Sequence, residues 1–141
     1  MTDTTSGAIG RNWWNIGLWV SQILLAVAFG MAGFLKALTP VADLGTMMNW
    51  VTVTPEWLVR FIGVVEFAGA LGMILPSATR ILPWLTPLAA LGFAVIQVLA
   101  IGVHANLGET AMSLPINLVL LALALFVVWG RWLQAPISPR A

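Results

Sequence analysis

Four long apolar stretches dominate this chain, at residues 16–35, 58–75, 85–103 and 114–129. Each holds about 16 to 20 residues, close to the ~20 that an α-helix needs to cross ~30 Å of hydrocarbon. Only 8% of the 141 residues are charged, whereas a soluble domain carries about 25%. We therefore predict an all-α polytopic membrane protein, in which one domain over residues 1–141 forms a bundle of four transmembrane helices in the lipid bilayer.

The composition excludes several classes of function. Six Lys and Arg against five Asp and Glu leave a net charge of +1, which offers no surface for nucleic acid. The absence of cysteine excludes thiol chemistry and Cys-ligated metals, and a single histidine excludes bis-His haem within one protomer. We expect no metal, no catalytic residues and no cofactor of the chain itself, other than a bound quinone or lipid. Whether the chain is an enzyme stays open, with non-enzyme favoured.

The basic residues predict the orientation of the bundle. An even number of spans places both termini and the loop at residues 76–84 on one side, which collects four basic residues: Arg11, Arg80, Arg131 and Arg140. The other side has only Lys36 and Arg60. The positive-inside rule then predicts cytoplasmic termini.

The loop at residues 39–57 is the longest connection. Val41, Leu44, Met47 and Met48 recur there at about helical spacing behind Thr39-Pro40, which predicts a short amphipathic helix on the outer surface. A plain capped turn is the alternative. In the pairs Thr39-Pro40, Thr54-Pro55 and Thr86-Pro87, we expect Thr to cap a helix and Pro to take its first position.

Polar residues from all four stretches fall in the outer half of the predicted membrane: Lys36, Glu66, Gln97, His104 and Asn117. An ionisable group at membrane depth costs at least ~2.5 kcal/mol and normally faces the bundle interior. We expect these five residues to form a cluster that binds a ligand or handles protons, with Lys36 rather than Arg60 as the partner of Glu66.

For Glu66, the structural alternatives are a buried ion pair or a neutral carboxylic acid that is hydrogen-bonded across helices. The others are an interfacial histidine, amides that join helices, and snorkelling Lys36 and Arg60. In the inner half, Ser21 and Gln22 stand alone, so we expect ordinary apolar packing there. Small residues let membrane helices approach closely, and we expect five glycines to mark the contact of the first two helices: Gly30, Gly33, Gly63, Gly69 and Gly72.

Several segments together resemble the DoxX-like family of small membrane proteins. Gly33-Phe34-Leu35-Lys36-Ala37-Leu38-Thr39-Pro40 is similar to the family's first-helix signature, and residues 60–76 are similar to its second helix. Thr86-Pro87, His104 and Asn117 also match, so the resemblance covers about residues 19–131. It implies a four-helix bundle in the bacterial inner membrane. Some relatives are linked to quinone- or thiol-using oxidoreductase complexes and distant ones to assembly chaperones, but the missing cysteines argue against a direct thiol role.

Three functional hypotheses follow. The first is a non-catalytic bundle that binds quinone or lipid, or that docks through its outer loop onto a partner membrane protein or a second copy in a homo-oligomer. The second is the membrane subunit of a quinone-linked oxidoreductase, in which Glu66 and His104 pass protons. The third is a small proton-coupled transporter with Glu66 as the coupling group.

Overall fold

A computed structural model describes residues 4–141, with side chains from Gly10 onward. The described chain is all-helical, in the order α1 (Thr4–Leu38), α2 (Val41–Met47), the 3-10 helix η1 (Asn49–Val53), α3 (Glu56–Thr79), α4 (Leu85–Asn106), α5 (Thr110–Trp129) and the π-helical turn η2 (Gly130–Gln134). Helices α1, α3, α4 and the continuous α5–η2 are each long and apolar enough to cross a membrane. The predicted four-helix membrane bundle is confirmed. Helices α3, α4 and α5 are a few residues longer than the apolar stretches, and α1 begins 12 residues before its stretch.

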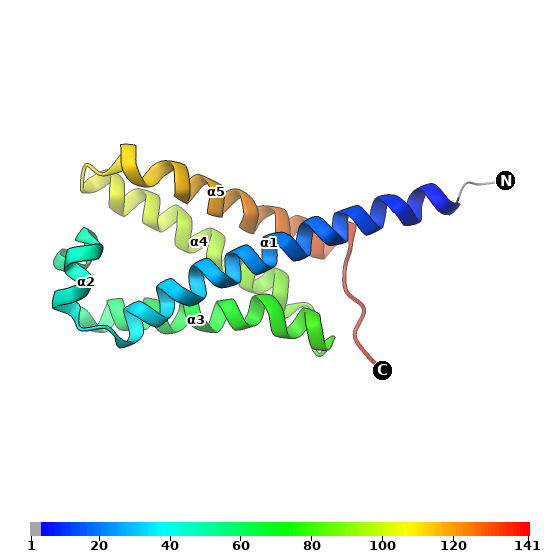
Figure 1. Ribbon diagram of the computed structural model, residues 1–141, viewed down its shortest axis with the longest axis horizontal. Coiled ribbons are helices and arrows are strands. Elements are labelled where there is room, and N and C mark those ends of the chain that lie inside the picture. Colours follow the sequence, from blue (N-terminus) through cyan, green and yellow to red (C-terminus); the bar gives the residue numbers. More distant parts are fainter. Residues whose placement is uncertain (1–3) are drawn as a thin grey trace.

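The four long helices run along the long axis of the molecule (Figure 1). Helix α1 packs along α3, and α4 packs along α5. Helix α2 lies at one end of the bundle, and both termini lie at the other, beyond which the first turns of α1 extend (Figure 1). We call these the α2 end and the terminal end.

The connection between α1 and α3 contains the predicted short helix, α2. Its Leu44 is fully buried and packs with Val51 and Val59 in a small apolar cluster at the α2 end. Met47, expected on the same face, is 61% exposed, because α2 ends at this residue and the chain turns into η1.

The predicted threonine caps were wrong. Pro40 and Pro55 themselves occupy the N-cap positions, with φ of −54° and −57° and ψ of 138°, and no side chain caps either helix. The Thr54 hydroxyl lies one residue too early and donates instead to the carbonyl oxygen of Trp50 at 2.7 Å. Helix α4 begins at Leu85, so Thr86 lies inside it and bonds to Ser77 on α3.

Glycine allows α1 and α3 to approach most closely. A Cβ atom on Gly33 would lie 2.6 Å from both the Gly63 carbonyl oxygen and the Phe67 amide nitrogen. Gly69 and Gly72, expected at the same contact, face α4 instead, where a Cβ would meet a phenylalanine ring and an alanine. At ~100° per residue, they lie about 240° and 180° from Gly63 around α3, so they cannot share its face.

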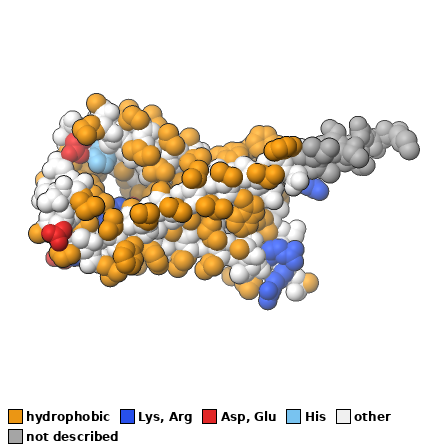
Figure 2. Space-filling model, in the orientation of Figure 1, with side chains coloured by type: hydrophobic (Ala, Val, Ile, Leu, Met, Phe, Trp, Pro, Cys, Tyr) orange, Lys and Arg blue, Asp and Glu red, His pale blue; other side chains and the backbone are white. Residues whose placement is uncertain are grey.

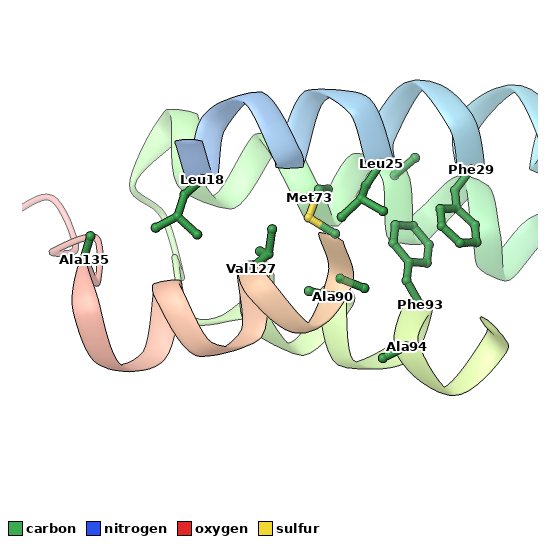
Figure 3. Packing of buried hydrophobic residues seen from close by; sticks show 11 residues of the cluster. Leu18, Leu25, Phe29, Met73, Ala90, Phe93, Ala94, Val127 and Ala135 are labelled. Carbon is green, nitrogen blue, oxygen red and sulfur yellow. The ribbon is translucent and has the colours of Figure 1, made fainter. Parts of the chain in front are cut away.

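The apolar core lies along the middle of the bundle (Figure 3). Leu18, Leu25 and Met73 are fully buried, and the rings of Phe29 and Phe93 stack with centroids 3.8 Å apart. Many of the remaining large apolar side chains are exposed. This distribution fits helices whose outer faces contact lipid.

The expectation of ordinary apolar packing near the terminal end was wrong. Arg131 is only 4% exposed and donates from Nε to Gln22 Oε1 at 2.6 Å and from Nη1 to Asn15 Oδ1 at 2.7 Å. Its guanidinium also lies 5.5 Å from the centre of the Trp19 ring. Arg131 belongs to this buried group rather than to a loop, because the helix continues through η2 and turns the side chain onto α1.

Candidate functional site

A cavity of about 260 Å³ lies between the four long helices toward the α2 end. All five polar residues singled out from the sequence line it, and they come from different helices: Lys36 from α1, Glu66 from α3, Gln97 and His104 from α4, and Asn117 from α5. Trp50 of η1 and apolar side chains complete the wall. Figure 2 shows the molecule hollowed near this end, beside the pale-blue histidine.

Lys36 and Glu66 form an ion pair in the wall of the cavity. The ammonium nitrogen Nζ lies 2.8 Å from Oε1 and 2.6 Å from Oε2, and the two side chains are 10% and 4% exposed. Lys36 comes three residues after Gly33, and Glu66 comes three residues after Gly63. Each therefore lies about one helical turn from the glycine at which α1 and α3 touch. The close approach of α1 and α3 thus brings the two charges together.

Arg60 does not pair with Glu66. Its guanidinium forms a salt bridge of 3.1 Å with Glu56 and donates to the carbonyl oxygens of Lys36 at 2.8 Å and Thr39 at 2.6 Å. These carbonyls belong to the last turn and the end of α1, which helical hydrogen bonds leave without partners. Arg60 therefore caps α1 rather than acting only as a snorkelling anchor.

The two amides that line the cavity have unused hydrogen-bonding atoms. Gln97 is 5% exposed and Asn117 is 8% exposed. Gln97 Oε1 and Asn117 Nδ2 are buried without a hydrogen-bond partner. Leaving such an atom unpaired costs about 1–3 kcal/mol. Two apolar side chains at these positions would therefore join the helices more stably than the two amides do.

His104 belongs to a chain of hydrogen bonds at the α2 end. Its Nδ1 lies 2.9 Å from Glu109 Oε2, and Glu109 Oε1 accepts from Asn49 Nδ2 at 2.9 Å. Hydrogen bonds from His104 and then Asn49 lower the pKa of the Glu109 carboxyl from its usual 4.5. Glu109 therefore links η1 to the turn between α4 and α5.

Glu109 was not identified from the sequence as a site residue. The signal available was its position five residues after His104, just beyond Gly108, whose φ of +74° reverses the chain. Asn49 gave no comparable signal. Among the described residues, no three His, Asp or Glu side chains gather in a way that could hold a metal.

Comparison with known proteins gives one match. No curated protein and no solved structure shows a significant similarity to the chain. The model of the DoxX-like family matches residues 20–127, a range that contains α3 and α4, most of α1 and α5, and the five polar residues of the cavity. Because this match spans well over half of the sequence, the chain belongs to the DoxX-like family.

Proposed function

We propose that this integral membrane protein binds a lipid-soluble molecule, of the quinone or lipid class, whose small polar head enters the cavity. The observation that carries the proposal is the combination of space with unpaired polar atoms. A bundle that needed only to be stable would fill this volume with apolar side chains, because an unpaired amide atom and an unfilled volume are both costly. A bound head group would fill the volume, and rotation of the two amides would let it supply their missing hydrogen bonds.

The surroundings of the cavity favour access from the bilayer. Leu99 and Val103 line it, yet they are 64% and 42% exposed on the outside of the bundle. Figure 2 shows the hollow on the side of the molecule, bordered by apolar side chains. With a volume of about 260 Å³, below the ~300–1,000 Å³ of pockets for drug-sized ligands, the cavity suits a head group whose tail remains in lipid.

Charge supports placing the terminal end in the cytoplasm of a bacterial cell, with the bundle in the inner membrane. Arg11 lies early in α1, Arg80 follows the end of α3 and Arg140 lies near the C-terminus, whereas the exposed acids Asp43 and Glu56 lie in α2 and at the start of α3. Figure 2 shows red side chains at the α2 end and blue ones at the terminal end. Lys36 and Arg60, the basic residues of the α2 end, are paired with carboxylates. The positive-inside rule therefore favours cytoplasmic termini.

The test compares the molecules that co-purify with the full chain in mild detergent, measured by native mass spectrometry. Ala100 lines the cavity on α4, and Ala105 lies exposed on the same helix. We expect Ala100→Phe to lose the retained molecule and Ala105→Phe to keep it. The proposal fails if the wild-type protein retains no lipid-soluble molecule, or if both variants retain as much as the wild type.

A role as membrane subunit of a quinone-linked oxidoreductase is the second candidate. The observation in its favour is that Glu66 and His104, which can both exchange protons, line the same cavity. His104 also contacts Glu109 toward the α2 end, which would let a proton reach a quinone that takes its electrons from the redox centre of a partner subunit. If quinone reduction in native membranes is unchanged by both Glu66→Gln and His104→Ala, this candidate is rejected.

A further inference from the structure

We infer that the ligand of this cavity carries an uncharged head with a hydroxyl group, and that anionic lipids are poor ligands. The inference rests on the proposed function, since it names the chemical class of the molecule that the cavity would hold. It follows from two properties of the wall, which are the state of its charges and the atoms that remain unpaired.

The charges of the wall are already neutralised within the protein. Both carboxylate oxygens of Glu66 contact Lys36 Nζ, and the same ammonium group lies 5.6 Å from the centre of the Trp50 ring. His104 is bonded to Glu109. A phosphate or carboxylate head would have to separate Lys36 from Glu66 and would leave Glu66 unpaired beside the new anion. Unpaired buried charges cost several kcal/mol each, so the cavity disfavours anions.

The two amides of the wall favour a ligand that both donates and accepts hydrogen bonds. Gln97 and Asn117 line the cavity, and their Oε1 and Nδ2 atoms are enclosed by protein without a partner. Each amide carries one accepting oxygen and one donating nitrogen. Rotation of either amide exchanges which atom faces the cavity, but the two amides together always present donors and acceptors. A hydroxyl group is the smallest head that serves both roles. An ether or an ester accepts without donating and satisfies only the donor.

Three probes with the same tail separate these possibilities: oleyl alcohol, oleyl methyl ether and oleyl phosphate. The full chain in nanodiscs is loaded with tritiated oleyl alcohol, and each unlabelled probe is titrated to displace it. We expect the methyl ether to bind about tenfold more weakly than the alcohol, as the loss of a net hydrogen bond implies. We expect the phosphate to bind more weakly still.

The matched variants are the double substitution Gln97→Leu with Asn117→Leu, and Gln134→Leu as the control. Leucine approximates the shape of both amides without polar atoms, so the double variant should fold at least as stably as the wild type. It should bind alcohol and ether equally. Gln134 is exposed near the terminal end, and Gln134→Leu should keep the tenfold preference.

The outcomes separate this inference from the proposed function. If the ether or the phosphate binds the wild type within about twofold of the alcohol, lipid binding stands and the hydroxyl head is refuted. If the double variant keeps the full preference, the assignment to Gln97 and Asn117 is refuted. If no tritiated alcohol binds the wild type, the hydroxyl head is refuted, and the proposed function is then decided by whether the wild-type protein retains a lipid-soluble molecule on purification.

Discussion

Replacing only one residue of the Lys36–Glu66 pair should destabilise the bundle far more than replacing both. At an effective dielectric of 20, unit charges 2.6 to 2.8 Å apart attract by about 6 kcal/mol. Desolvation of two ions offsets most of this attraction. Lys36→Met or Glu66→Leu alone should therefore cost about 3–5 kcal/mol, since each leaves an unpaired buried charge. The double variant should lie within about 1–2 kcal/mol of the wild type.

The assay is reversible unfolding of the full chain in detergent micelles, followed by circular dichroism as a double-mutant cycle. Glu56→Gln is the control, because Glu56 is 64% exposed in its pair with Arg60 and such pairs contribute less than about 1 kcal/mol. The reasoning is refuted if each single substitution costs under about 1 kcal/mol and the two effects simply add.

Three further predictions use the same unfolding measurement or a distance measurement. Gly33→Ala should destabilise the bundle by about 1–3 kcal/mol through overpacking against the backbone of α3. Gly102→Ala, where nothing lies within 4 Å, should be neutral or slightly stabilising in the same assay. Arg131→Met should cost about 1–3 kcal/mol in thermal unfolding, because it leaves the buried Gln22 Oε1 and the half-buried Asn15 Oδ1 without a donor. Folding lowers the pKa of Glu109 from 4.5. The bond from Asn49 of η1 to the Glu109 carboxylate should therefore be fully formed above pH 4.5, and it should be lost as the pH falls through the pKa of the folded state. Spin-label distances between η1 and the α4–α5 turn should lengthen on acidification in the wild type, and in Glu109→Gln they should be long at every pH.

The membrane fold could be predicted because length and apolarity are properties of each segment by itself. A helix in hydrocarbon satisfies its own backbone, so four spans follow without knowledge of their contacts. The helix that each glycine contacts could not be predicted in this way. Gly63 and Gly69 are both small residues of the same apolar stretch, and only their angular positions around α3 decide that Gly63 contacts α1 and Gly69 contacts α4.

The polar residues of the cavity could be located from the sequence because depth along a helix is countable. Depth placed Lys36 and Glu66 in the same half of the membrane, and charge selected them as partners. Arg131 escaped the same reasoning because it follows the last apolar stretch and looks like a loop residue. Its partners all lie on α1, at spacings of four and three residues that place them on one helical face: Asn15, Trp19 and Gln22. This periodicity was the available signal.

The two buried polar groups of the bundle show what distinguishes a candidate site from a structural network. The group around Arg131 contains a charge and an unpaired Nη2 atom, but its Nε and Nη1 atoms donate to α1 and to the carbonyl oxygen of Ala135 just after η2. Arg131 does not line the cavity. In the group at the α2 end, two amides line open space and each has a buried atom without a partner. Its charges are matched because Gly33 and Gly63 bring α1 and α3 into contact one turn away. On the proposed function, helix packing would therefore determine the ligand chemistry. The glycine contact neutralises the wall, and a ligand would be held by hydrogen bonding without charge.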